Sequence, residues 1–179
     1  VYTFRDFLEE RVHGDYTHVL LRRTMLRHPY EENVRIHEGV FCLSFYKDAG
    51  EVRFVNSVVQ ERDRSRDDRV TFSLVPDNEA TLSRHSQALA ILCERFGEDL
   101  RQTAQGRSVM CRHLLKMHRF TTMLGHRSAA SAAERELAAI GCPVPTLWRT
   151  LRRLRLGPAF FAVARLYVKL KFAIGIRPE

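Results

Sequence analysis

The sequence predicts an α/β protein in which a partial mixed sheet is followed by a helical extension. Two β-rich stretches lie in the first third of the chain, over residues 16–21 and 52–59. From Glu79 onward the apolar residues instead recur at helical spacing. The chain has 179 residues, of which 45% are hydrophobic and 28% charged, so it is long enough and apolar enough to bury a core.

The first third alternates between helix and strand signals. Thr3 and Asp6 form a capping pattern before an apolar helical face, and Gly14 is suited to end that helix. The strand over 16–21 follows and ends at Arg22-Arg23. A helix is then predicted over 40–47, with Glu38-Gly39 near its start.

Residues 48–50, Asp-Ala-Gly, have turn composition, and the second strand follows over 52–59. Because its valines and phenylalanine make both faces apolar, this strand is predicted to be buried. A charge-dense loop, 61–69, comes next. Its acids alternate with arginines, so ion pairing within the loop is favoured over a metal site at Asp67-Asp68.

The rest of the chain is predicted to be helical. Leucine and phenylalanine spacing indicates one helix from Glu79 to Gly97 and a second from about Asp99 to Leu124, weakened near Gly106. A third, alanine-rich helix begins at Ser128 or Ser131 and stops at Gly141, before Pro143. Thr146 can cap a final helical pair, which Gly157-Pro158 interrupts.

Several short motifs in the first third together resemble a known family. In order they are Gly14-Asp15-Tyr16, Arg22-Arg23, His28-Pro29-Tyr30, His37-Glu38-Gly39 and Phe54-Val55-Asn56. Their order and rough spacing are similar to the acceptor-side half of bacterial family 2 glycosyltransferases, enzymes of the GT-A type. The resemblance covers about residues 1–75 and implies a GT-A-like mixed sheet there.

The resemblance also implies a reaction and its cofactor. Such enzymes transfer a sugar from a nucleotide-sugar to a lipid-linked or polysaccharide acceptor in cell-surface glycan synthesis. Their nucleotide-binding half comes first and carries an Asp-x-Asp motif for a divalent metal, Mg²⁺ or Mn²⁺. The chain opens at Val1 already past that motif. We therefore expect it to lack the metal ligands and to be inactive alone.

Glu38 is the candidate catalytic residue. The family takes its base from an acidic pair near a helix start, and a carboxylate that deprotonates the acceptor hydroxyl contributes about 10²–10⁴ in rate. Here the pair reads Glu38-Gly39, so the second acid is missing. The alternative is a carboxylate stabilised only by the helix dipole, by up to about 1 kcal/mol.

The candidate acceptor-binding residues flank this base in the sequence. Glycine permits close backbone approach and aspartate can bond a sugar hydroxyl, whereas arginine can hold a diphosphate through its forked donors. The residues are Gly14, Asp15, Arg22, Arg23 and Arg62. The alternatives are a helix cap followed by a turn for the first two, and solvated or ion-paired surface side chains for the arginines.

The four cysteines are predicted to be reduced thiols, mostly buried, in a cytosolic protein. Cys42, Cys93, Cys111 and Cys142 are widely scattered and form no C-x-x-C pair. Cys111 and His113 are too few to define a metal site, so packing is the favoured role for both.

The positive charge is concentrated at the C-terminal end. The formal net charge is +8, and residues 137–179 carry eight basic side chains against the single acid Glu179. The tail therefore holds +7 and residues 1–136 only +1. Such a block indicates an anionic partner, either a membrane surface or nucleic acid.

The tail combines this charge with apolar residues. Leu147, Leu151 and Leu154 share one helical face, and the segment 160–172 is aromatic, basic and free of acids. It is too charged to span a bilayer but suited to lie in the interface plane. The candidate membrane-contacting residues are Trp148, Arg149, Arg152, Arg153, Phe160, Phe161, Arg165 and Lys169. The alternative is a helix packed on the body; nucleic acid is disfavoured because no groove-entering motif is present.

Three parts are therefore predicted: an acceptor-side part over 1–75, a helical extension over 76–136 and basic membrane-associating helices over 137–179. With no signal peptide and no long apolar run, the predicted location is the cytoplasm, at the inner face of the membrane. The rival from another class is a non-enzymatic basic adaptor that binds membranes or nucleic acid through residues 146–177.

Overall fold

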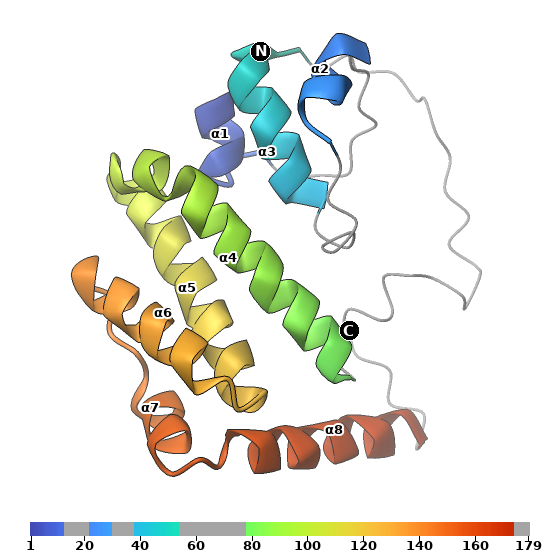
Figure 1. The fold of residues 1–179 in the computed structure, drawn as a ribbon, viewed down its shortest axis with the longest axis vertical. Coiled ribbons are helices and arrows are strands. Elements are labelled where there is room, and N and C mark those ends of the chain that lie inside the picture. The colour runs from blue at the N-terminus through green and yellow to red at the C-terminus, as the bar shows by residue number, and fades with distance from the viewer. Residues whose placement is uncertain (13–21, 30–37, 54–77, 174–179) are drawn as a thin grey trace.

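The computed structural model describes residues 1–12, 22–29, 38–53 and 78–173. Within these ranges helices predominate, and the strands form one small antiparallel sheet (Figure 1). In chain order the elements are β1 (Tyr2–Thr3), α1 (Phe4–Leu8), α2 (Arg22–Arg27), α3 (Glu38–Ala49), β2 (Glu51–Val52), α4 (Glu79–Arg101), α5 (Ala104–Met123), α6 (Arg127–Ala139), α7 (Thr146–Arg153) and α8 (Gly157–Ala173).

Within the described residues the sheet consists of two short strands. β1 and β2 pair antiparallel, with Tyr2 opposite Val52 and Thr3 opposite Glu51. No GT-A-like sheet is present in the described residues. The strand predicted over 16–21 and the part of the second strand after residue 53 lie outside them.

The N-terminal capping pattern is confirmed, although the described helix is short. The Asp6 carboxylate accepts a hydrogen bond from the Thr3 backbone N–H at 2.8 Å, and the Thr3 hydroxyl oxygen accepts one from the Asp6 N–H. α1 ends at Leu8, and Gly14, its predicted end, is outside the described residues. Phe7 stacks on Tyr46 of α3, with ring centroids 3.9 Å apart, so this turn of helix is held by packing.

α3 is confirmed and begins at Glu38, two residues before the predicted helix. Its buried side chains include Val40, Phe45 and Tyr46. The arginine doublet differs from the prediction, because Arg22 and Arg23 begin α2 rather than ending a strand.

The break predicted near Gly97 is wrong. Gly97 is buried inside α4, where it packs beside the Met110 side chain of α5, and the helix continues to Arg101. The break comes at Gln102–Thr103 instead, because the Thr103 hydroxyl accepts the Gly106 N–H at 2.9 Å and starts α5. α4 and α5 therefore form a tight antiparallel pair (Figure 1).

Glycine permits the closest contact in this pair. A Cβ added to Gly106 would overlap the backbone carbonyl of Leu100, and no rotamer change can relieve a clash with backbone. Gly157, the first residue of α8, approaches the Thr122 carbonyl of α5 in the same way. The two ends of α5 are thus held by contacts that a larger residue would prevent.

The remaining helices follow the prediction closely. α6 begins at Arg127, just before the predicted Ser128, and ends before Gly141. The final helical pair is also confirmed, with α7 beginning at Thr146 and α8 at Gly157. The predicted cap is wrong, because Pro145 occupies the N-cap position of α7 and no side chain makes a capping bond there. Figure 1 shows α4, α5 and α6 side by side, with α8 crossing near one end of this group.

The prediction that all cysteines are reduced is wrong. Cys111 of α5 and Cys142, just after α6, form a disulfide with their Cα atoms 5.9 Å apart. The sequence did not indicate this pair because 31 positions separate the two residues and only the α5–α6 packing brings them together. Neither Cys42 nor Cys93 forms a disulfide within the described part of the chain.

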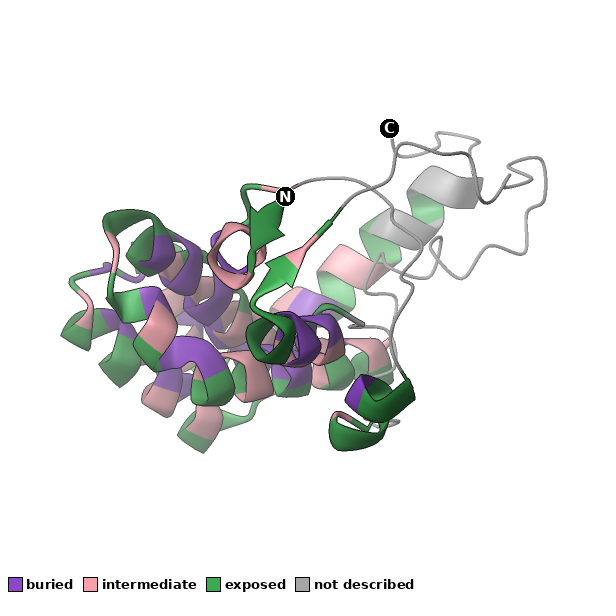
Figure 2. Ribbon diagram, turned by 90° about the horizontal axis from the view of Figure 1, so that it is seen from above, coloured by how far each residue is buried: buried purple, intermediate pink, exposed green. Residues whose placement is uncertain are grey.

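One hydrophobic core joins the N-terminal helices to the C-terminal ones. It includes Leu8 of α1, Phe45 of α3, Leu100 of α4, Met110 of α5 and Leu137 of α6. Figure 2 shows the buried positions gathered where these helices face one another.

A fully buried carboxylate reinforces this junction. Glu9, directly after α1, accepts a hydrogen bond of 2.5 Å from the Thr103 hydroxyl. Its other carboxylate oxygen forms an ion pair with the Arg11 guanidinium at 2.5 Å. Burial alone would raise the pKa of Glu9, but the Thr103 hydroxyl and the guanidinium groups of Arg11 and Arg5 outweigh it and hold the pKa below its usual value. Glu9 is therefore ionised and links the N-terminal segment to the cap of α5.

We expect Gly106→Ala to destabilise the protein by about 1–3 kcal/mol, the usual cost of forcing extra atoms into a packed site. The measurement is urea unfolding followed by circular dichroism. Gly39→Ala is the matched control, because nothing lies within 4 Å of a Cβ at that helical position. Equal stability of the two variants would contradict the close contact at Leu100.

Candidate anion-binding pocket

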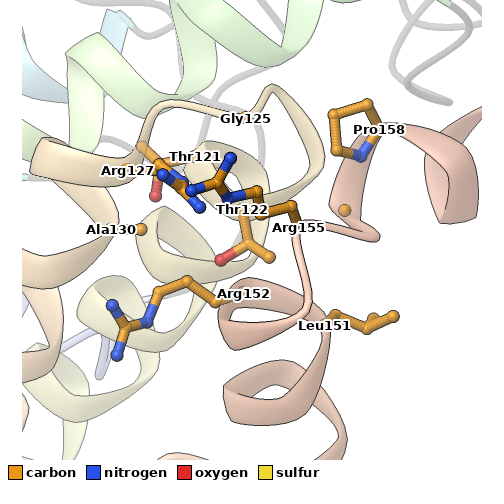
Figure 3. Close-up of a pocket in the computed structure, with 10 residues that line it drawn as sticks. Thr121, Thr122, Gly125, Arg127, Ala130, Leu151, Arg152, Arg155 and Pro158 are labelled. Atoms are coloured by element: carbon orange, nitrogen blue, oxygen red, sulfur yellow. The ribbon is translucent and has the colours of Figure 1, made fainter.

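A pocket of about 290 Å³ lies where four helices meet (Figure 3). The end of α5, the start of α6, the end of α7 and the start of α8 all contribute to its wall. Three arginines and two threonines supply its polar groups: Arg127, Arg152, Arg155, Thr121 and Thr122. The other lining residues are apolar or glycine, so no acidic side chain lines the pocket.

Local backbone geometry creates the pocket. Gly157 has no side chain and packs on the Thr122 carbonyl, which brings the start of α8 against the end of α5. Arg155, in the turn before it, has a positive φ of 60°. A non-glycine residue adopts this conformation only where the surroundings hold it, and here it carries Arg155 into the pocket wall.

The three arginines differ in how their charges are matched. Arg152 pairs with Glu134 of α6 and also donates to the Ser131 hydroxyl at 2.9 Å. Neither Arg127 nor Arg155 forms an ion pair with a described residue. Figure 3 shows these two side chains extending toward one another from opposite sides of the pocket. The wall therefore presents two positive charges that described acids leave unmatched.

Polar groups on α5 add to this wall. Thr122 is only 4% exposed, and its hydroxyl has no hydrogen-bond partner among the described residues. One turn earlier, His118 is fully buried, and both its ring nitrogens likewise lack a described partner. Burial lowers the pKa of His118 despite the opposing effect of the Glu134 carboxylate, so the imidazole is neutral near pH 7.

Two helix starts also face the pocket. α6 begins at Arg127, and its N-cap residue His126 makes no side-chain capping bond. α8 begins at Gly157, which lines the pocket together with Pro158. The free N–H groups and the positive end of the dipole at such starts favour an anion.

No family model, curated protein or solved structure matches this chain.

The predicted acceptor site is only partly described. Glu38 is the first residue of α3, and its side chain is not described. Gly14, Asp15 and Arg62 lie outside the described residues. Arg22 and Arg23 are exposed at the start of α2. The described residues therefore do not show them together with the rest of the predicted acceptor site.

The aromatic residues predicted to contact a membrane are mostly packed. Phe161 is buried, and Trp148 meets Phe160 edge to face with ring centroids 5.3 Å apart. Arg149 pairs with Glu134 at 3.5 Å, whereas Arg153 is exposed and Arg165 half-buried. Lys169 belongs to α8, but its side chain is not described.

The exposed apolar face of α8 consists of other residues. Val163, Leu166, Tyr167 and Leu170 are each 55–68% exposed. Their spacing of three, four and seven positions from the first places them on one side of the helix. We call these four residues the α8 stripe.

Neither the pocket nor the stripe was predicted from the sequence. Arg127 and Thr122 lie 10 and 15 residues before the basic tail begins at residue 137, and Arg155 was predicted only as part of the tail charge. The helical spacing of the stripe residues could have predicted this face of the helix. The predicted membrane contacts were instead assigned to aromatic and basic residues.

No other described cluster presents a comparable site. Glu10 pairs with Arg112 at 2.6 Å and lies 3.4 Å from His113. The charges of Glu10 and Arg112 neutralise each other, so this cluster presents no unmatched charge to a ligand. No group of three or more potential metal ligands converges within the described residues.

We expect Thr122→Val to stabilise the protein by about 1–3 kcal/mol, because it replaces a buried hydroxyl that has no described partner with a methyl of similar shape. Thermal unfolding monitors the change. Thr121→Val is the matched control and should destabilise, since its hydroxyl donates to the Met117 carbonyl at 2.7 Å. A loss of stability in Thr122→Val would indicate that the hydroxyl already has a partner.

Proposed function

We propose that this chain is the acceptor-side part of a GT-A-type glycosyltransferase that works at an anionic membrane surface. The reaction is transfer of a sugar from a nucleotide-sugar to a lipid-linked or polysaccharide acceptor. Its motifs in residues 14–56, including Glu38, resemble those of bacterial family 2 glycosyltransferases. The observation that carries the proposal is the start of α3 at Glu38.

The position of Glu38 suits a general base. α3 spans twelve residues and begins at Glu38, and the family that the chain resembles takes its base from an acidic residue near a helix start. In this proposal Glu38 takes the proton of the acceptor hydroxyl as that oxygen attacks the anomeric carbon. A nucleotide-binding half would supply the ligands of a divalent metal, which would stabilise the departing diphosphate.

The C-terminal helices support attachment to a membrane surface. The α8 stripe exposes apolar side chains on one face, and Arg153 and Arg155 are exposed just before the helix. Apolar burial in the head-group region combines with about 1 kcal/mol for each basic residue near an anionic surface. No helix in the described part of the chain is long and apolar enough to cross a bilayer.

The same stripe favours a second candidate function, a membrane-binding adaptor without enzymatic activity. The stripe belongs to α8 and does not depend on Glu38 for its exposure. The two functions are distinguished by turnover, since an adaptor binds vesicles but transfers no sugar.

We expect Glu38→Gln to lower kcat at least about a hundredfold in the protein that carries its nucleotide-binding half, because the amide cannot accept the hydroxyl proton. Donor binding should be unchanged. The measurement is sugar transfer under saturating donor and acceptor. Glu51→Gln, at an exposed acid of β2, is the matched control. Near-normal turnover of Glu38→Gln removes this residue from the reaction.

We expect Leu166→Glu to weaken binding to vesicles that contain phosphatidylglycerol by about tenfold or more, since it places a charge in the apolar stripe. Vesicle flotation at low and high salt measures the effect. Leu26→Glu makes the same substitution at an exposed leucine of α2 and serves as the control. Equal binding by both variants would refute docking through the stripe.

A further inference from the structure

We propose that the pocket at the meeting of α5, α6, α7 and α8 binds a phosphate monoester. This site is separate from Glu38 and from the α8 stripe, and the inference holds whether or not the chain belongs to a glycosyltransferase. The observation behind it is the convergence of three arginines on one pocket that no acidic side chain of the described residues lines.

The charge of the pocket selects the ligand class. Glu134 neutralises Arg152, which leaves the charges of Arg127 and Arg155 without a described acid. A phosphate monoester carries about −1.5 to −2 at pH 7, so it matches two positive charges. A carboxylate or a phosphate diester carries only one negative charge and leaves the pocket with excess positive charge.

The donor geometry is also that of a phosphate site. Guanidinium groups offer forked N–H donors that match the tetrahedral oxygens of phosphate, and Arg127 and Arg155 extend toward each other across the pocket (Figure 3). Arg127, the first residue of α6, also places the positive end of that helix at the pocket wall.

The pocket has room for more than the phosphate itself. Its volume of about 290 Å³ accommodates part of the alcohol to which the phosphate is esterified. Leu154 and Leu156, on either side of Arg155, are 61% and 46% exposed and give this edge an apolar border. The phosphate can therefore belong to a lipid head group or to a free phosphate ester, two sources with the same recognition chemistry.

The test is calorimetric titration of the full chain with inorganic phosphate in a phosphate-free buffer at constant ionic strength. We expect the double variant Arg127→Gln/Arg155→Gln to weaken binding about a hundredfold, about tenfold for each lost charged contact. Arg84→Gln/Arg135→Gln removes the same charge from exposed positions outside both the pocket and the basic tail, and should change affinity less than about threefold.

Equal losses in the two double variants, or no saturable binding to the unmodified chain, would overturn the proposal. Circular dichroism confirms that each variant is folded. If the pocket double variant is not, the single variants Arg127→Gln and Arg155→Gln replace it. Each should weaken phosphate binding, and unchanged affinity in both would equally overturn the site.

Vesicles then distinguish the two sources. Phosphatidylcholine vesicles that contain phosphatidic acid present a phosphate monoester, whereas those with phosphatidylglycerol at equal surface charge present a diester. A preference for phosphatidic acid that disappears in the pocket double variant assigns the site to a lipid. If the pocket double variant loses inorganic phosphate binding but the unmodified chain binds the two vesicle types equally, the site is assigned to a free phosphate ester.

Discussion

The arrangement of the C-terminal helices depends on two backbone contacts, one near each end of α5. At one end Gly106 meets the Leu100 carbonyl, and at the other the Thr122 carbonyl meets Gly157. Neither position tolerates a side chain, so α4 and α8 approach α5 more closely than ordinary side-chain packing allows. The first contact sets the α4–α5 pair on which the core is built, and the second places the start of α8 beside the pocket.

Charge is distributed unevenly over this frame. Glu134 is the acid that meets the basic tail, and it pairs with both Arg149 and Arg152. Because residues 137–178 contain no acid of their own, the remaining arginines of α7 and the following turn stay unmatched within the tail. α8 contributes to both features, since its first residues line the pocket and the apolar stripe lies farther along the same helix.

The features that were predictable from the sequence are those decided by neighbouring residues. The Thr3–Asp6 cap, the helix near Glu38 and the end of α6 before Gly141 all follow from local chemistry. The failures depend on residues distant in sequence. Gly97 was read as a helix end, but the tertiary packing of α4 on α5 overrides its low helix propensity. The Cys111–Cys142 bridge and the pocket likewise exist only once the helices have packed.

The Glu9 carboxylate makes the junction between α1 and the bundle sensitive to acid. Because its pKa is depressed in the fold, ionised Glu9 contributes its full stabilisation above the usual value of 4.5, and this is lost as the pH falls through the lowered value. Protonation would weaken the ion pair with Arg11 and the bond to Thr103 together. The first segment to detach in an acidified solution should thus be the amino-terminal one, with the α5 cap loosening beside it.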